Sequence, residues 1–390
     1  MMTTSRTVDH LVIGGGPAGA MAAVRLAEAG RQVTLAEKES GPHGTVCGEF
    51  LSREAVDYLK SVAIAPSGLG AKPIDSVRLY AGKKCAEAAL PFPALSLSRR
   101  LLDAVLLERA AEAGCEVLRG RCVQQLAAHD HGWVAEFESG EGITARTVFL
   151  ASGKHNVRGW SRGRGRQNGL VGFKMHWRLG AAQVAALREC IELFLFPGGY
   201  AGLSLVEDDT ANLCMAVRRP SLHLAGGWKG LLTRMLELNL PLRERLRGAE
   251  ALASQPLAIA PIPYGYLAAS SSGLWRIGDQ AAVIPSFTGD GIAIALHSAT
   301  LAVQMLLDGK SADEYLSTLR VQLSRPMRLG TWVSRAMIAP PSRYAAPLLS
   351  ALLPAVLRAI ASATRVPDQA LVSMRSDSIS AARPWLRQTP

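Results

Sequence analysis

The chain has 390 residues, of which 48% are hydrophobic and 19% are charged, a composition that is typical of a folded globular protein and excludes a largely disordered one. This length is sufficient for a large core and for two closely joined domains. The formal net charge of +11 favours an anionic partner. Because the sequence has no zinc-finger, helix-turn-helix or RNA-binding motif, we expect no nucleic acid.

The N-terminus and the cysteines indicate a reducing compartment. The first ten residues contain no apolar run, so we expect no signal peptide and a cytoplasmic protein. The cysteines form no Cys-x-x-Cys pair and lack the spacing of metal ligands, so we expect reduced thiols and no metal site. They are Cys47, Cys85, Cys115, Cys122, Cys190 and Cys214.

Residues 9–38 predict a strand, a glycine-rich turn, a helix and a second strand. The glycines fit G-x-G-x-x-G: the first permits a tight turn, the second lets the backbone approach a pyrophosphate, and the third lets the helix pack on the strand. The helix begins near a proline, and its amide end favours phosphates. A glutamate ends the second strand, where it can accept ribose hydroxyls. We therefore expect a bound dinucleotide, held by Gly14, Gly16, Pro17, Ala18, Gly19, Glu37 and Lys38.

Residues 158–166 form the most basic stretch of the chain. They are glycine-rich and lie between two ordered segments, which predicts a solvated loop. A contact for an anion is the alternative, either the phosphate of NADPH or the phosphopantetheine arm of a carrier protein. The arginines are Arg158, Arg162, Arg164 and Arg166.

Residues 75–90 and 170–220 predict an antiparallel sheet, with turns at 197–199 and 208–209. Along "LVGFKMHWR" the side chains alternate, which places Phe173, Met175 and Trp177 on one face and Lys174, His176 and Arg178 on the other. The apolar face is either core or the wall of an apolar pocket. We expect His176 and Lys174 to be surface or satisfied groups rather than acid–base groups, and Tyr200 to be the best candidate for a pocket hydroxyl.

Residues 273–306 predict a second strand–turn–helix unit. A dehydrogenase that uses only a nicotinamide needs no such distal element, whereas FAD lies extended and contacts one segment with its adenosine and another with its ribityl chain and ring. We expect Asp279 to accept ribityl hydroxyls and the helix N-terminus to face the pyrimidine edge of the ring, where negative charge accumulates on reduction. Asp290 has an alternative role as a helix cap. The expected contacts are Gly278, Asp279, Pro285, Gly289, Asp290, Gly291 and Ile292.

In this order, the motifs resemble those of the FAD-dependent monooxygenase and geranylgeranyl reductase superfamily, whose fold is that of p-hydroxybenzoate hydroxylase. The resemblance implies an α/β fold with a Rossmann-type FAD-binding domain of the glutathione reductase kind (1–70, 95–165 and 266–310). It further implies an antiparallel β-sheet substrate domain (71–94 and 166–265) and a C-terminal helical region (311–390).

The same resemblance assigns several site residues. "SRRLLDAVLLERAAEAG" matches a family helix that places Arg99 against FAD and gives Asp103 a structural role. "TVCGEFLS" is similar to the Cys-Gly segment of the reductase branch, so that Cys47 and Gly48 run beside the flavin ring. Glu49 is a candidate acid or base, although we favour an exposed carboxylate in the first turn of the helix that follows Ser52.

Three departures from the superfamily leave its branch open. Where the hydroxylases carry an Asp-Gly motif tied to NAD(P)H, this chain has Ser152 and Gly153, with Arg158 retained. The Trp-x-Trp-x-x-Pro element of flavin halogenases is missing. Only the tyrosine of the Tyr-x-Trp-x-Phe-Pro element of the reductases is present here, as Tyr200.

The C-terminal part from Ser311 predicts helices. Residues 343–367 are apolar on most sides, with Arg343, Arg358 and Arg365 spaced along them, and the prolines at 347 and 354 interrupt them too often for a membrane span. We expect a helical cap on the two domains, with a peripheral membrane contact as the alternative.

FAD supplies the difficult chemistry in such proteins, and the chain supplies position and electrostatics. We expect a monooxygenase that hydroxylates a small hydrophobic or aromatic substrate, free or carrier-bound, through a flavin hydroperoxide in secondary metabolism, with NAD(P)H as donor. A reductase or dehydrogenase acting on a C–C or C–N bond is the alternative, and a non-catalytic FAD-binding protein is a minor one. Cys47 and Tyr200 are the catalytic candidates.

Overall fold

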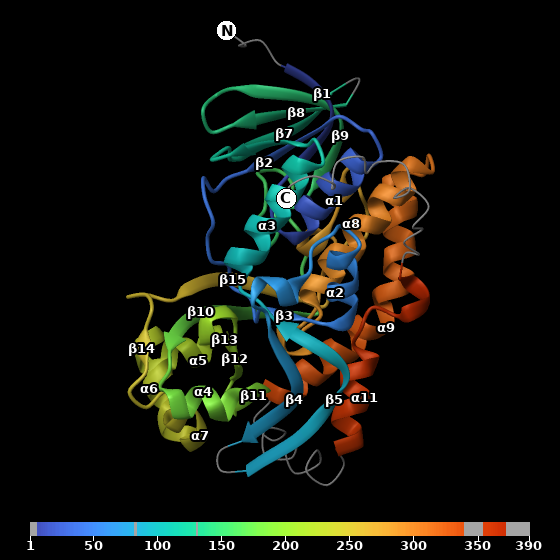
Figure 1. Cartoon of the computed structure of the whole chain (residues 1–390). Coiled ribbons are helices and arrows are strands. Elements are labelled where there is room, and N and C mark those ends of the chain that lie inside the picture. Colours follow the sequence, from blue (N-terminus) through green and yellow to red (C-terminus); the bar gives the residue numbers. More distant parts are fainter. Residues whose placement is uncertain (1–5, 82–83, 130–131, 339–353, 372–390) are drawn as a thin grey trace, which may run out of the picture.

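The computed structural model describes residues 6–81, 84–129, 132–338 and 354–371 (Figure 1). Two large β-sheets form the frame of the molecule, one in its upper part and one in its lower part in the view of Figure 1. Helices lie between and beside the sheets. The division of the chain into an FAD-binding domain and a substrate domain, together with the boundaries between them, stays a prediction.

The first sheet has seven strands in the order β6-β2-β1-β9-β8-β7, with β17 paired to β9. Strands β6, β2, β1, β9 and β17 run parallel, whereas β8 and β7 are antiparallel additions. Every residue of β2 is buried, as expected for a parallel strand covered on both faces. The strands are β1 (Arg6–Ile13), β2 (Val33–Glu37), β6 (Glu116–Arg119), β7 (Val123–His129), β8 (Gly132–Phe137), β9 (Gly142–Leu150) and β17 (Trp275–Arg276).

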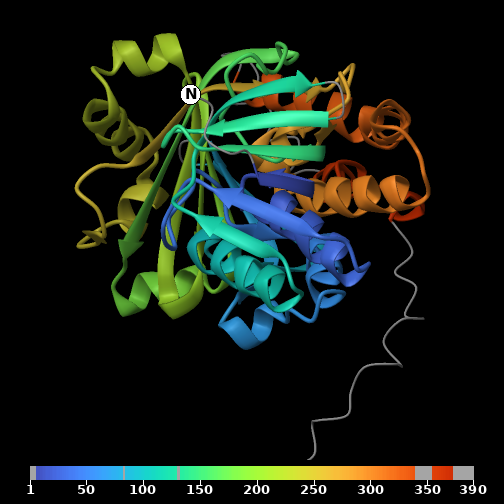
Figure 2. The same cartoon turned by 90° about the horizontal axis from the view of Figure 1, so that it is seen from above.

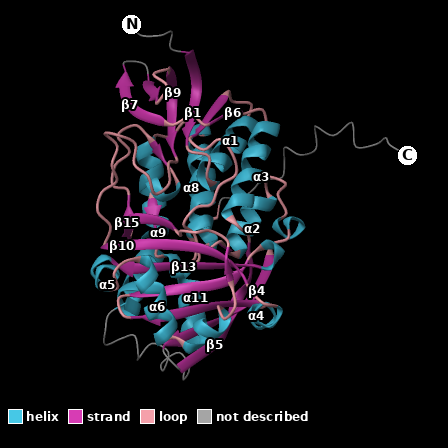
Figure 3. Cartoon of the chain, turned by 90° about the vertical axis from the view of Figure 1, so that its left-hand side faces the viewer, coloured by secondary structure: helices cyan, strands magenta, loops and turns pink. Residues whose placement is uncertain are grey.

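The second sheet has nine strands in the order β14-β10-β13-β12-β11-β4-β5-β3, with β15 paired to β10 (Figure 3). All of its pairs are antiparallel except β11 with β4. The strands are β3 (Phe50–Leu51), β4 (Lys72–Ala81), β5 (Lys84–Ser96), β10 (Gln167–Arg178), β11 (Glu189–Phe196), β12 (Gly199–Leu205), β13 (Thr210–Arg218), β14 (Glu250–Ala251) and β15 (Leu257–Tyr264), beside a small separate pair, β16 (Tyr266–Leu267) and β18 (Ala282–Val283).

Helix α1 follows the first strand and packs against α3 and α8. It begins at Pro17, as predicted, and Gly30 follows its end with a φ of 74°, which glycine adopts without steric cost. Seen from above, α9 and α11 lie on the opposite side of the molecule from α5, α6 and α7 (Figure 2). The helices are α1 (Pro17–Glu28), α2 (Arg53–Lys60), α3 (Arg99–Glu112), α4 (Ala181–Leu187), α5 (Arg219–Leu224), α6 (Trp228–Leu238), α7 (Leu240–Arg245), α8 (Gly291–Leu307), α9 (Ala312–Ile338) and α11 (Pro354–Ala363).

One continuous core joins the two sheets. It includes Val12 and Leu35 from the first sheet, Leu79 and Leu195 from the second, and Leu296 from α8, all at most 5% exposed. Shared burial of this kind fixes the position of the sheets relative to each other, so that the loops at their seam are held in place.

The local predictions for the α/β fold are confirmed. The strands expected around the turns at 197–199 and 208–209 are β11, β12 and β13, and the segment 75–90 forms the hairpin β4–β5. All six cysteines are free.

The C-terminal region is helical over its described residues. Helix α11 packs against β5 and α9, as expected for a cap on the two domains. Arg358 is exposed, whereas Arg365 is only 6% exposed, and Arg343 lies outside the described residues. Within the described ranges, the helices lack the combination of length and apolar character that crossing a membrane requires.

Phe194 tests the core of the second sheet. Its side chain is fully buried and its ring stacks on Tyr80 with 5.2 Å between ring centroids. We expect Phe194→Ala to lower the free energy of unfolding by about 3–5 kcal/mol, because it removes a large buried side chain and leaves a cavity. Leu224→Ala, at a residue that is 79% exposed, is the control and should change it by less than about 0.5 kcal/mol in the same urea titration.

Candidate FAD and substrate site

A cavity of about 620 Å³ lies at the seam of the two sheets. One end is formed by the glycine turn after β1, and the other by apolar side chains of β4, β5, β11, α9 and α11. Of the predicted site residues, the structure places Gly16, Pro17, Ala18, Cys47, Gly48, Arg99, Tyr200, Gly278, Asp279, Gly289, Gly291 and Ile292 on its wall.

The glycine turn has the geometry of a phosphate site. A Cβ on Gly19 would lie 1.8 Å from the carbonyl oxygen of Gly14, so only glycine lets α1 begin this close to β1. No side chain caps the N-terminus of α1, and its first amide groups are left for a ligand. Gly14 and Gly19 therefore shape the turn without lining the cavity, and Gly16 to Ala18 present its surface.

Three further glycines on the cavity wall leave space for a flat ring such as that of flavin. Gly48, Gly153 and Gly291 all line the cavity, and a Cβ added to any of them would meet no atom within 4 Å. They come from three different segments, which expose bare backbone to the same space. These residues fit an FAD molecule that extends from the glycine turn to the seam of the sheets.

Glu37 and Lys38 lie outside the cavity wall. The Glu37 carboxylate accepts hydrogen bonds from the backbone N–H groups of Gly15 (2.6 Å) and Glu39 (2.9 Å), so it also fixes the glycine turn. The side chain of Lys38 pairs with Glu39 at 3.4 Å and is 46% exposed. The contact of Glu37 with a ribose stays a prediction, and nothing in the geometry directs Lys38 to the cofactor.

Arg99 begins α3 and lies against the glycine turn. Its Nη2 would be 3.3 Å from a Cβ on Gly16, and two of its nitrogens donate to Asp103 at 2.7 Å each. This bidentate pair is of the strong, oriented type, so Asp103 holds the guanidinium beside the cavity. Arg99 would contact FAD, and Asp103 has the structural role that the sequence predicts.

Asp279 lies on the cavity wall in the turn after β17. Its carboxylate is 3.7 Å from the Nζ of Lys154, whose ammonium donates to the carbonyl oxygen of Val46. The carboxylate is only 26% exposed and would hold the ribityl hydroxyls of FAD. Arg162 donates to the carbonyl oxygens of Asp279 and Lys154, so this arginine of the basic stretch supports the site.

The rest of the basic stretch is exposed. Arg158, Arg164 and Arg166 point to solvent, as a solvated loop predicts. Ser152 does not line the cavity, and its hydroxyl donates to the carbonyl oxygen of His155 at 2.8 Å.

The N-terminus of α8 faces the cavity through Gly291 and Ile292. The alternative that Asp290 caps this helix is wrong, because its side chain makes no cap hydrogen bond. The carboxylate instead accepts from the Ser52 hydroxyl (3.2 Å) and the Val366 N–H (2.9 Å) and pairs with Arg365 at 3.2 Å. The first amides of α8 are thus free of a side-chain cap, and Pro285 precedes them outside the cavity wall.

Arg365 closes the cavity from the C-terminal region. Its guanidinium also donates to the carbonyl oxygen of Thr288 and lies 4.9 Å from the ring centroid of Phe92. Asp290 and Arg365, from residues far apart in the chain, therefore fasten α11 to the start of α8. Sequence reasoning missed this pair, because neither residue belongs to a sequence motif that predicts a contact with the other.

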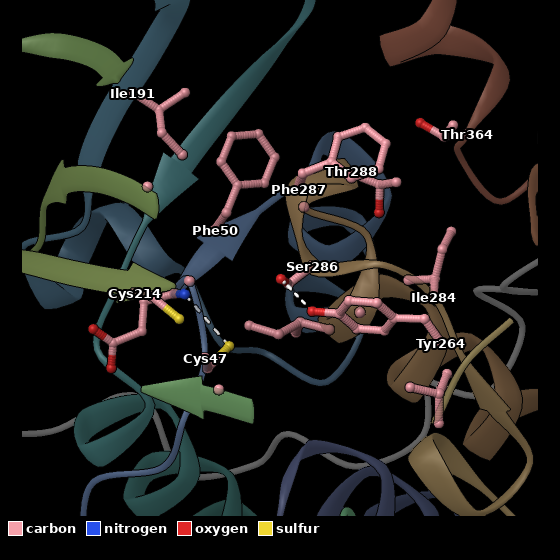
Figure 4. A pocket seen from close by; sticks show the side chains of 18 of the residues that line it. Cys47, Phe50, Ile191, Cys214, Tyr264, Ile284, Ser286, Phe287, Thr288 and Thr364 are labelled. Carbon is pink, nitrogen blue, oxygen red and sulfur yellow. Dashed lines mark hydrogen bonds between the residues drawn. The ribbon is translucent and has the colours of Figure 1, made fainter. Parts of the chain in front are cut away.

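Cys47 and Glu49 occupy the segment that crosses the cavity. The expectation that Glu49 is exposed is wrong, since its side chain is fully buried and bound by Lys174 and His176 from β10. The backbone N–H of Glu49 donates to the Sγ of Cys47 at 3.3 Å (Figure 4). Cys214 also lines the cavity, and burial raises the pKa of its thiol to about 12.

Tyr200, Tyr264 and Ser286 form a cluster of hydroxyls on the cavity wall. Figure 4 shows two of them, Tyr264 and Ser286, side by side. The Ser286 Oγ is 2.8 Å from the Tyr200 hydroxyl and 2.6 Å from that of Tyr264. The backbone N–H of Phe287 donates to the Tyr200 hydroxyl at 3.2 Å. Burial raises the pKa of both tyrosines, so both stay neutral near pH 7. Sequence reasoning found Tyr200 and missed Tyr264 and Ser286.

The remainder of the wall is apolar and reaches the surface between α9 and α11. Trp332 and Val356 both line the cavity and are 68% and 40% exposed. Of the alternating residues of β10, Phe173 belongs to the core cluster of the second sheet, Trp177 is partly buried against that cluster, and Met175 is buried. None of the three lines the cavity.

The comparisons with known proteins agree with this geometry. Residues 7–155 match the FAD binding domain family. The chain is 27% identical over 330 residues to a digeranylgeranylglycerophospholipid reductase of Methanopyrus kandleri, covering 78% of each chain, and 26% identical over 333 residues to protein FixC of Escherichia coli, covering 76% of this chain and 71% of FixC.

Solved structures show the same fold. The flavin-dependent brominase Bmp2 aligns with a TM-score of 0.75 over 94% of this chain and 96% of its own, at 15% identity. A geranylgeranyl bacteriochlorophyll reductase-like protein of Thermoplasma acidophilum aligns with a TM-score of 0.69 over 95% and 96%, at 18% identity.

The fold, the cavity and the FAD binding domain define an FAD-dependent oxidoreductase. Residues 7–155 are those that match the FAD binding domain family, and over most of its length the chain is similar to the reductases and flavin-dependent enzymes named above.

Gly19 tests the cofactor site. We expect Gly19→Ala to weaken FAD binding by at least about a hundredfold, or about 2.7 kcal/mol, because the new methyl group would overlap the Gly14 carbonyl. The measurement is the flavin absorbance retained per chain after gel filtration. Gly68→Ala, where a Cβ would meet no atom within 4 Å, is the control. Full flavin content in Gly19→Ala would contradict the assignment.

Asp290 gives a prediction for how the free energy of unfolding depends on pH. Burial raises its pKa from 3.8 to about 6, although Arg365 opposes the shift. The folded state binds the proton of Asp290 more tightly than the unfolded state does. Protonated Asp290 therefore stabilises the folded state fully below pH 3.8, and this stabilisation is lost as the pH rises through 6. The free energy of unfolding of the wild type minus that of Asp290→Asn should fall by about 3 kcal/mol between pH 3.5 and 7. A difference that stays constant over this pH range would contradict the prediction.

Proposed function

We propose that this protein is a monooxygenase that hydroxylates an apolar, electron-rich aromatic substrate, with a phenol as the favoured class and NAD(P)H as the electron donor. The observation that carries the proposal is the cluster of Tyr200, Tyr264 and Ser286 in the wall of a largely apolar cavity. The apolar wall binds the ring by burial, and the hydroxyls are the polar groups that can orient a phenol.

The hydroxyl cluster can accept a hydrogen bond from a phenol. Since the Phe287 N–H already donates to the Tyr200 oxygen, the Tyr200 proton is directed to Ser286 or Tyr264. A phenol whose hydroxyl donates a hydrogen bond to an oxygen of this cluster becomes more electron-rich at its ring carbons, which favours hydroxylation there. FAD, when bound, supplies the activation of oxygen, and the chain's share is to exclude water, orient the ring and accept the hydrogen bond of the phenol.

A reductase is the second candidate, and Cys47 favours it. The thiol lies on the cavity wall in a segment that resembles the reductase branch, and the relatives named above include reductases of isoprenoid lipids. In that reaction a hydride adds to one carbon of a double bond, and Cys47 or Tyr200 gives the proton to the other. The same apolar wall suits an alkene.

The electron donor, the partners and the location complete the proposal. NAD(P)H is supported by the superfamily, although Ser152 stands where the hydroxylases carry an acid. The substrate is a small hydrophobic compound, either free or on a carrier protein. A cytoplasmic location is supported by the six free cysteines.

The mass of the product decides between the candidates. The FAD-loaded protein is incubated with NADPH or NADH, ¹⁸O₂ and a panel of apolar phenols and alkenes. A product heavier by one ¹⁸O atom supports hydroxylation, whereas a product heavier by two hydrogens, formed without oxygen, overturns it in favour of the reductase. Persistent flavin with no product and no reduction by either nicotinamide favours a non-catalytic FAD-binding protein.

Tyr200→Phe then tests the hydroxyl cluster. We expect it to lower kcat by about tenfold, because one hydrogen-bond partner of the phenol is lost while the cavity keeps its shape. Tyr80→Phe is the control: Tyr80 is also buried and donates to Glu192, away from the cavity. Equal rates for wild type and Tyr200→Phe would contradict the role of the cluster.

A further inference from the structure

Glu49 has a strained backbone and a buried charge in the same residue. Its φ is 60°, in the left-handed region that costs a residue with a Cβ about 1–2 kcal/mol. Its side chain is fully buried, and a carboxylate without partners is expensive to bury. Such a residue persists only where its surroundings hold it in place.

The partners of the carboxylate come from two other segments. Oε1 accepts from the Nζ of Lys174 and from the backbone N–H of Arg99 (2.7 Å), and Oε2 accepts from the Nε2 of His176 (2.7 Å). Lys174 is buried and His176 is partly exposed, both on β10. Glu49 thus ties the substrate sheet to the first residue of α3, whose guanidinium lies against the glycine turn.

The backbone of Glu49 is held as firmly as its side chain. Its carbonyl oxygen accepts from the Leu97 N–H and the Ser96 hydroxyl, each at 3.0 Å. On the other side of Gly48, the Asn212 side chain donates to the carbonyl oxygen of Cys47 at 3.2 Å. The Cys47–Gly48 peptide is therefore fixed on one side by the hydrogen bond from Asn212 and on the other by the hydrogen bonds of Glu49. The Sγ of Cys47 also accepts from the Glu49 N–H.

The carboxylate is ionised in this setting. Burial by itself would raise the pKa of Glu49, but the hydrogen bond from His176 and the charge of Lys174 outweigh burial, so the pKa lies below its ordinary value. A protonated side chain could not accept from all three donors in the same way.

We propose that Glu49 is a positioning residue that holds Cys47 and Gly48 in the conformation that receives the flavin ring, and that Lys174 and His176 hold Glu49. The inference rests on FAD binding and is independent of whether the reaction is a hydroxylation or a reduction. Its ligand is the cofactor itself, and its effect is measured without substrate.

The chain offers a matched control in Glu192. This carboxylate is also fully buried and is bound by Arg78, Tyr80 and Arg245 within the second sheet, but it does not line the cavity. Glu49→Gln and Glu192→Gln therefore make the same chemical change in two buried ion clusters, of which only one touches the cofactor segment.

The experiment compares FAD affinity and the reactivity of Cys47 in both variants. FAD is titrated into the apoprotein and followed by its fluorescence, and the alkylation rate of Cys47 by iodoacetamide is followed by peptide mass spectrometry over pH. We expect Glu49→Gln to weaken FAD binding about tenfold and to change the rate and pH profile of Cys47 alkylation, because charge-assisted hydrogen bonds that fix the segment are lost. Glu192→Gln should change FAD affinity by less than about twofold, even if both variants lower the Tm.

A double variant keeps the test decisive if Glu49→Gln does not fold. Glu49→Gln with Lys174→Met removes the unpaired ammonium along with the carboxylate, so that no charge is left buried alone. If the folded double variant binds FAD as the wild type does and alkylates with the same pH profile, the positioning role is overturned and the cluster only neutralises Lys174. Continued weak binding with an altered Cys47 profile supports it.

Discussion

Helix α1 lies directly on the glycine turn because Gly19 has no side chain, and the cavity depends on this contact. The contact brings the uncapped N-terminus of α1 to one part of the cavity wall. Helix α8 packs against α1, and its own N-terminus then reaches the same wall. Two helix ends without side-chain caps thus converge on one space from units far apart in the chain, which favours the negative charge of phosphates and of a reduced flavin.

The parts of the fold that were predictable are those in which the signal is local. The turn from Gly14 to Gly19, the start of α1 at Pro17 and the end of β2 at Glu37 follow from spacing and from residue types with restricted backbones. The turns between β11, β12 and β13 were equally readable, because these strands pair with their neighbours along the chain and short turns separate them. The alternation along β10 is less plain in the structure, because residues 170–175 are all buried.

The parts that were not predictable depend on partners distant in sequence. Glu49 meets Lys174 across 125 positions, and no local pattern distinguishes it from an exposed carboxylate at the start of a helix. Tyr264 and Ser286 join Tyr200 only after β12, β15 and the loop before α8 meet at one part of the cavity wall. One local feature of the sequence indicates that Glu49 is buried: the apolar pair Phe50–Leu51 follows it directly, and this pair forms the buried strand β3. Asp290 shows the opposite case. Its residue type and position predict a local helix cap, but its carboxylate pairs instead with Arg365, which is distant in sequence.

The pair of Asp290 and Arg365 has a consequence for how the protein is made. The cavity wall on the side of α11 comes from the last described residues of the chain, and it is fastened to α8 by a residue that the ribosome adds long after the start of that helix. The residues placed at the expected FAD site, from Gly16 to Ile292, all precede α11 in the chain. They are therefore synthesised before the part of the wall that α11 contributes.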